Sequence, residues 1–419
     1  MYAAQRAYPL YLVMRSTYAF AFALVLTYEL AYHAVFLALT PLQLVFVGVV
    51  LESMTIAFEI PTGMFADLVS RRLSVITGIL LTGLGFLTEA LIPSFTAVLI
   101  AQVLWGIGFT FYSGAEAAWI VDEIGAERAP TIFLRATQLS QGFTIFGTLC
   151  GALLASHTTV LPIIVGASIF LCLGVSLCFT MAEDGFHPLR DQPQQSRGHH
   201  VLQPLRMTLQ LVRIRPLLRV ILVLGVLIGV SLGGFDRLYT PHVLPYLSSP
   251  LVQSVGSVTW LGLINTVVSV LSLIGTEIIR RRYQLTDQQR IMQILFGLYS
   301  GMIIGSFAFA LSGIPAVAIA GFCLTQTLRT IGRPLLLIWI NQNAEKQIRA
   351  TVISSYWQAN ACGQVVGSPF LGWIGTLVSL RAALSVGTFL YIGTLPVLFF
   401  AQRQWSAKAQ RDTQEVSGP

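Results

Sequence analysis

The sequence has little charge. Only 10% of its 419 residues are Asp, Glu, Lys or Arg, whereas 55% are hydrophobic and the mean hydropathy is +0.73. Soluble globular domains carry about 25% charged residues, so this composition excludes that class. It indicates an integral membrane protein whose immediate surroundings are the lipid bilayer.

The chain also lacks short motifs that mark several enzyme and metal-binding classes. No Walker A sequence, H-E-x-x-H or C-x-x-C occurs, which disfavours ATP hydrolysis and zinc chemistry. His199 and His200 are adjacent but have no acid or cysteine at ligand spacing. All five cysteines fall inside apolar segments, as expected of small buried residues. They are Cys150, Cys172, Cys178, Cys323 and Cys362. We therefore expect no enzyme activity, no cofactor and no metal site.

Long apolar segments recur along the chain. Segments of about 20 or more residues without period-2 alternation exceed a β-barrel strand and predict membrane-spanning helices. The first six run over residues 10–36, 41–60, 73–92, 95–121, 132–155 and 160–181, and the next six over 217–239, 251–279, 291–311, 316–340, 351–374 and 382–401. The sequence thus predicts an all-α membrane protein of twelve transmembrane helices.

The only long polar stretch lies between the two sets of six. It contains "EDGFHPLRDQPQQSRGHH", which is rich in Pro, Gln and charge and is typical of a linker. We expect an N-terminal six-helix bundle over residues 1–181, a cytoplasmic linker over 182–215, a C-terminal six-helix bundle over 216–402 and a cytoplasmic tail over 403–419.

Lys and Arg concentrate in alternate gaps between the apolar segments. The basic residues of one set of gaps are Arg71, Arg72, Arg128, Arg190, Arg197, Arg206, Arg213, Arg215, Arg280, Arg281, Arg282, Arg290, Lys346 and Arg349, and the tail adds Arg403, Lys408 and Arg411. The other set holds little beyond Arg237 and Arg381. Cytoplasmic loops carry this excess, so both termini are predicted to be cytoplasmic. Scattered basic residues do not indicate nucleic-acid binding, and the long first segment does not indicate a cleaved signal peptide.

An internal repeat relates the two halves. "WIVDEIGAERAPTIFLRATQLSQGFTIFGTLCGALLAS" from Trp119 aligns with "WINQNAEKQIRATVISSYWQANACGQVVGSPFLGWIG" from Trp339. Gly142, Gly147 and Gly151 then correspond to Gly363, Gly367 and Gly372. Repetition over half the chain predicts two pseudo-symmetric bundles, an architecture that occurs in transporters with a site between the halves.

The stretch "PTGMFADLVSRR", residues 61–72, carries one acid and two arginines between two apolar segments. It resembles the G-x-x-x-D-R-x-G-R-R signature of the major facilitator superfamily, which Gly63, Asp67, Arg71 and Arg72 match. Leu68 and Ser70 replace an arginine and a glycine of that signature. The resemblance implies a cytoplasmic gating motif, with Asp122 as a partner for Arg71 or Arg72. Positive-inside anchoring of the arginines is the alternative.

The resemblance extends along the chain. "SGAEAAWIVDEIG", "GGFDRLYTPHVL" and "INQNAEKQIRATVIS" are similar to stretches of bacterial superfamily members grouped with drug and macrolide exporters. It implies a location in the bacterial cytoplasmic membrane. "GQVVGSPFLG", with Gly363, Gly367, Pro369 and Gly372, is similar to the antiporter motif of this superfamily, and Gly142, Gly147 and Gly151 match it without a proline. Close packing of helices through small residues is the alternative.

Ionisable groups inside apolar segments are candidate functional residues, because charge is costly in a bilayer. Glu52 lies about 16 Å along its helix from Pro41, near the middle of a core about 30 Å thick. It is the candidate for proton coupling, and a structural acid is the alternative. Arg329 and Arg333 lie one turn apart. The resemblance places them in a cavity wall opposite Glu116, as an ion-paired gate or as contacts for an anionic substrate group.

Three functions fit these patterns. The first is proton-coupled, alternating-access export of hydrophobic or amphipathic small molecules, as in multidrug antiporters. The second is import of a small polar or anionic solute, and the third is a membrane sensor or assembly protein with the same fold. We favour the first, with small-molecule substrate and protons as partners, and we expect a monomer.

Overall fold

The computed structural model describes residues 2–125, 127–186, 216–247, 257–283, 288–344 and 349–402, and no β-strand occurs among them. Most of the predicted linker, with His199 and His200, and the tail over 403–419 lie outside the described residues. The described chain is almost wholly helical, which satisfies backbone hydrogen bonds inside each segment, as a bilayer requires.

The described residues of the first half form seven α-helices and one π-helical turn. They are α1 (Tyr2–Ala31), η1 (Tyr32–Phe36), α2 (Pro41–Leu68), α3 (Arg71–Leu91), α4 (Phe95–Tyr112), α5 (Ala115–Ile124), α6 (Ala129–Ala155) and α7 (Leu161–Thr180). Several of these helices have a Ser or Thr as the N-cap residue. Its side-chain oxygen accepts a hydrogen bond from a backbone N–H that would otherwise be unpaired. Thr40, Ser70 and Ser94 cap α2, α3 and α4 in this way.

The described residues of the second half form six α-helices and one 3₁₀ turn. They are α9 (Pro216–Val243), η3 (Leu244–Leu247), α10 (Ser257–Arg282), α11 (Gln288–Leu311), α12 (Pro315–Asn343), α13 (Arg349–Leu377) and α14 (Leu380–Ile392). The apolar span that starts with α14 continues to Gln402.

Nine segments of the described chain are long and apolar enough to cross a membrane. The remaining three of the twelve predicted spans correspond to α6, α12 and α13, which have the length but carry more polar side chains. The fourth span consists of α4 and α5. It breaks at Gly114, whose φ of 81° lies in the left-handed region. The predicted all-α fold with twelve spans is confirmed.

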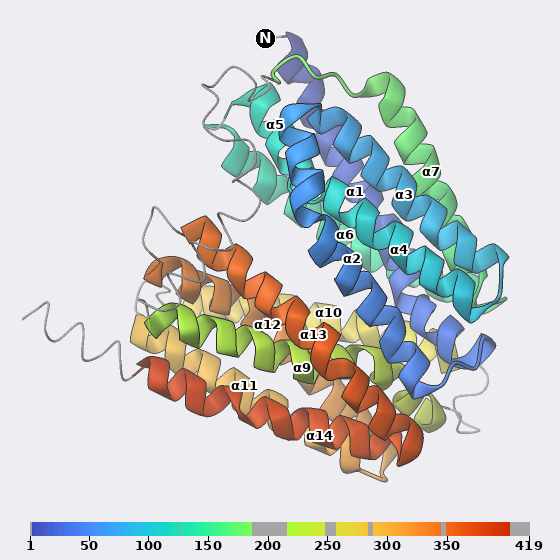
Figure 1. The fold of residues 1–419 in the computed structure, drawn as a ribbon, viewed down its shortest axis with the longest axis vertical. Helices are drawn as coiled ribbons and strands as arrows, with labels where there is room; N and C mark the ends of the chain where they lie inside the picture. The colour runs from blue at the N-terminus through green and yellow to red at the C-terminus, as the bar shows by residue number, and fades with distance from the viewer. Residues whose placement is uncertain are drawn as a thin grey trace, which may run out of the picture. The chain divides into compact units, whose positions relative to one another are not determined.

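The described helices form two compact units. One holds α1 to α7, η3 and the start of α10 up to Thr266; the other holds α9, α11 to α14 and α10 from Val267. In the first unit α1 packs against α6 and α7, and α3 packs against α4 and α7 (Figure 1). In the second, α9 packs against α13 and α14, and α11 packs against α12 and α14. The two units therefore repeat one packing scheme.

Corresponding residues of the sequence repeat occupy the cores of the two units. Trp119 and Trp339 are each 1% exposed, and Ile120 and Ile340 are 0% and 1% exposed. Each tryptophan belongs to the main apolar cluster of its own unit. The repeat thus reflects equivalent packing positions.

One boundary differs from the sequence expectation. Residues 61–72 were expected to be a gap, but α2 continues through Pro61 to Leu68, so Gly63 and Asp67 are helical and only Val69 and Ser70 separate α2 from α3. Proline is tolerated inside membrane helices because neighbouring groups satisfy the freed carbonyl.

Candidate functional site

A charged pair in the first unit joins α1 to the fourth span. The break at Gly114 starts a new helix, and Glu116 lies in the first turn of α5, where the helix dipole favours an acid. Arg15 of α1 donates a hydrogen bond of 2.8 Å to Glu116, and the two side chains are 31% and 10% exposed. The pair balances charge inside the unit.

Tyrosines lie beside this pair. Tyr18 of α1 stacks on Tyr112 at the end of α4, with ring centroids 4.2 Å apart and an interplanar angle of 8°. Phe22 and Phe170 also pack on Tyr18. The surroundings of Glu116 therefore combine a buried charge pair with flat aromatic surface, which suits a ligand that is part apolar and part polar.

The second unit contains a charged group on its first and fourth helices. Asp236 of α9 accepts two hydrogen bonds from Arg329 of α12, and the Nη2 to Oδ2 distance is 2.7 Å. Arg333, one turn further along α12, lies over the ring of Trp357 at 5.3 Å from its centroid. Within the described part of the chain Arg333 makes no ion pair. The group therefore carries a net positive charge.

Glu116 and Arg329 each have an ion-pair partner in their own unit. The expectation that Arg329 and Arg333 lie opposite Glu116 stays a prediction. Consecutive helical residues such as Asp236 and Arg237 do not face each other, whereas residues on packed helices do.

The predicted gating motif forms a compact set of contacts where α2, α3 and α5 meet. Arg71 makes an ion pair with Asp122, donates to the carbonyl of Ala118 at 3.2 Å and lies 3.3 Å from a carboxylate oxygen of Asp67. The structure thus shows the expected contact between Arg71 and Asp122. The gating role itself stays a prediction.

The neighbouring contacts explain one departure from the superfamily signature. Ser70, which replaces a glycine, caps α3 by accepting from the backbone N–H of Leu73 at 3.0 Å. Its hydroxyl also donates to Glu183 at 2.6 Å, and the other Glu183 oxygen accepts from the backbone N–H of Arg72 at 2.9 Å. Arg72 reaches the carbonyl of Cys178 at 2.5 Å. Gly63 has open space where a side chain would stand.

Glu52 lies on α2 and is partly buried. Leu51 and Met54 pack against Gly106 of α4. Successive residues of a helix are rotated by about 100°, so the Glu52 side chain points away from that contact. Glu59 stands two turns further along the same face. The proton-coupling role of Glu52 stays a prediction. Glu59 is exposed and lies about 10 Å further along α2.

The glycines of the repeated motif pack helices together. A Cβ at Gly147 of α6 would lie 2.6 Å from the carbonyl of Phe20 on α1, and one at Gly363 of α13 would lie 2.5 Å from the carbonyl of Val226 on α9. A Cβ at Gly151 would likewise overlap the Tyr28 ring, and one at Gly367 would overlap the Val230 side chain. Gly142 has open space, Gly372 is buried and Pro369 lies within α13. These contacts support the close-packing interpretation.

A Gly-x-Ser-x-Gly sequence, Gly229 to Gly233, lies within α9. Its serine donates to the carbonyl of Leu227 at 2.8 Å along the helix. A hydrolase nucleophile needs a sharp strand-to-helix turn there, so this pentapeptide does not form one.

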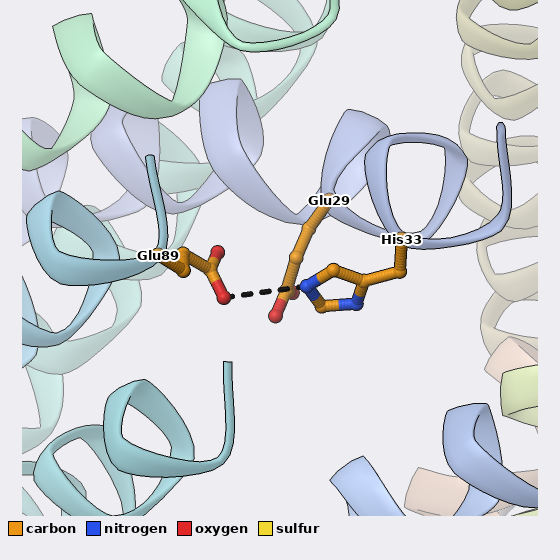
Figure 2. A group of neighbouring side chains, drawn as sticks. All are labelled: Glu29, His33 and Glu89. Atoms are coloured by element: carbon orange, nitrogen blue, oxygen red, sulfur yellow. Dashed lines mark hydrogen bonds and ion pairs between the residues drawn. The ribbon is translucent and has the colours of Figure 1, made fainter. Parts of the chain in front are cut away.

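Sequence reasoning missed a buried polar cluster at the end of the first unit that holds η1. Figure 2 shows the side chains of Glu29, His33 and Glu89 directed toward one another. His33 Nε2 lies 3.3 Å from a Glu89 oxygen, and Gln102 donates to Glu29 at 2.9 Å. The four-residue spacing of Glu29 and His33 was a visible signal, since it places both on one helix face. Glu89 and Gln102 come from other helices.

Comparison with known proteins identifies similar chains. The sequence model of the Major Facilitator Superfamily matches residues 8–363. A protein described as an uncharacterized MFS-type transporter, YxaM of Bacillus subtilis (strain 168), is 22% identical over 364 residues, which are 86% of this chain and 86% of that protein.

Solved structures of transporters share the fold. A variant of the nucleoside transporter NupG superposes with a TM-score of 0.76 at 13% identity, covering 94% of this chain and 99% of that one. A structure of a proton-dependent oligopeptide transporter gives a TM-score of 0.68 at 11% identity, covering 95% and 97%. At such identities the likeness concerns the fold.

Proposed function

Because this chain belongs to the Major Facilitator Superfamily, we propose that it is a proton-coupled secondary transporter that exports amphipathic small molecules by alternating access. Family membership makes it an integral multi-pass membrane protein that transports small molecules. The substrate class, the coupling ion and the direction are our proposal.

One observation carries the proposal: each unit has a charged pair between its first and fourth spans. Arg15 and Glu116 join α1 to the α4–α5 span, and Asp236 and Arg329 join α9 to α12. Superfamily resemblance assigns these spans to the cavity wall. Charged side chains inside membrane spans are costly and mark substrate or ion pathways.

The aromatic neighbours support an amphipathic substrate. The stacked pair of Tyr18 and Tyr112 lies near Glu116, and Trp357 lies beside Arg333. Flat rings bind apolar groups while the charged side chains orient polar ones.

A second candidate is import of a small polar or anionic solute, which Arg333 favours. Its guanidinium adds a positive charge that no carboxylate of the described residues balances through an ion pair. Such a charge attracts an anionic group. Nucleoside and oligopeptide transporters among the similar structures are consistent with a polar solute.

The test uses purified protein in liposomes that enclose a pH-sensitive dye. Lipophilic compounds and small anions are added in turn, and proton movement is followed for the wild type and for Glu52→Gln. Glu277→Gln is the control, because Glu277 pairs with Arg280 and Arg281 at the exposed end of α10.

We expect proton flux that depends on a lipophilic compound, is lost in Glu52→Gln and is kept in Glu277→Gln. Flux with anions alone would favour the import candidate and Arg333. An absence of flux across the whole panel contradicts the proposed transport, and unchanged flux in Glu52→Gln contradicts the proton site.

A further inference from the structure

The buried cluster of Glu29, His33, Glu89 and Gln102 is unlike the charged pairs described above, because it contains two acids. His33, Glu89 and Gln102 are each 0% exposed and Glu29 is 2% exposed. It joins α1 and η1 to α3 and α4.

Charge balance limits what this cluster can hold. His33 supplies at most one positive charge, so the three ionisable groups carry at least one negative charge whenever both carboxylates are ionised. A bound cation would complement two carboxylates beside a single imidazole, because an opposite charge stabilises ionised carboxylates in a protein interior.

The donor atoms have the arrangement of a cation site. One ligand atom from each of Glu29, His33 and Glu89 lies within 4.8 Å of the others, and Figure 2 shows the three side chains converging. The π-helical turn η1 begins at Tyr32 and carries His33. Such turns redirect side chains and often occur at functional sites.

Gln102 adds a fourth donor. Its amide oxygen is buried and accepts no hydrogen bond from the described residues, while its nitrogen donates to Glu29. A 180° rotation of the amide exchanges the positions of its oxygen and its nitrogen, which have nearly the same size and shape. With that rotation the cluster offers one imidazole nitrogen and three oxygens.

We propose that Glu29, His33, Glu89 and Gln102 bind a divalent first-row transition-metal ion, such as Zn²⁺ or Mn²⁺. One imidazole with carboxylate and amide oxygens suits these ions, and four donors match the tetrahedral coordination of zinc. The site ties together α1, α3 and α4. Gln102 is seven residues from the start of α4, about 10 Å along its axis, which sets the depth of the site from the α3–α4 turn.

The test measures binding by calorimetry and does not depend on transport. Full-length protein is purified without a polyhistidine tag in a His199→Gln, His200→Gln background, which removes the adjacent histidines. Zn²⁺ and Mn²⁺ are titrated in two buffers of different ionisation enthalpy, so that proton release is measured together with affinity.

We expect one ion per chain and release of at least about one proton per ion. His33→Gln and Glu89→Gln should each weaken binding by at least about 10-fold. His157→Gln, which changes an exposed histidine, should leave the affinity unchanged.

Two outcomes overturn the site. One is no saturable binding of either ion by the background protein. The other is undiminished affinity in both cluster variants. If those variants do not fold, X-ray absorption of the zinc-loaded background protein decides: nitrogen and oxygen ligands including one imidazole support the site, and sulfur ligands overturn it.

Discussion

Arg329 of α12 and Asp236 of α9 form a bidentate pair, in which both guanidinium Nη atoms donate to the two carboxylate oxygens. The side chains are 18% and 36% exposed. A planar guanidinium matches a carboxylate at two points, so the pair fixes the distance and the rotation between the two helices.

Asp236→Asn should destabilise the protein by about 1–3 kcal/mol, because it leaves the Arg329 guanidinium without its charged partner in a largely buried position. Thermal unfolding in detergent measures this change. Glu277→Gln breaks an exposed pair and should cause no measurable shift. Equal midpoints for Asp236→Asn and the wild type would contradict a structural role for the pair.

Two glycines of α6 provide a matched comparison of helix packing. Gly147→Ala should destabilise the first unit by about 1–3 kcal/mol, because its Cβ would overlap the Phe20 carbonyl. Gly142→Ala meets open space and should be neutral or stabilising by about 0.5–1 kcal/mol through lower chain entropy. Denaturant-induced unfolding of both variants measures these changes in the free energy of unfolding. Similar losses would mean that the packing around α6 differs from the one described.

Gly114→Ala should cost about 1–2 kcal/mol, because its φ of 81° is unfavourable for any residue with a Cβ. Open space surrounds the position, so a steric clash does not contribute. Gly63→Ala, also in open space but within a helix, is the control for thermal unfolding. A loss no greater in Gly114→Ala than in this control would show that α4 and α5 join in another conformation.

Asp122→Asn should slow transport more than Asp67→Asn, because Arg71 contacts Asp122 more closely. Substrate affinity should be preserved in both variants, since the contact lies at one end of the unit. Transport rates and equilibrium binding are measured on the same preparations. Unchanged rates in both variants would favour the anchoring interpretation of Arg71.

Sequence patterns predicted the spans well because hydropathy is a local property. The apolar runs gave the number of membrane segments. The continuation of α2 through Pro61 was not predicted, because a proline next to charged residues indicates a loop unless neighbouring helices support it.

Side-chain partners were predicted less well because they depend on which helices are neighbours. Glu116 lay beside an arginine of α1 that sequence reasoning had overlooked, although Arg15 falls inside an apolar segment. The contact between Arg71 and Asp122 was found through a family pattern. The Glu29 and His33 spacing was visible, but Glu89 came from α3, more than 50 residues away.

The contacts of Glu183 determine when one part of the first helical bundle can form. Its carboxylate accepts from Ser70 and from the backbone of Arg72 across separations of 113 and 111 residues. A ribosome releases the chain from the N-terminus, so α3 is synthesised well before this acid exists. The contact can form only after Glu183, which follows α7, has been synthesised. The contacts of Glu183 with Ser70 and Arg72 therefore form only when synthesis of the first six spans is complete.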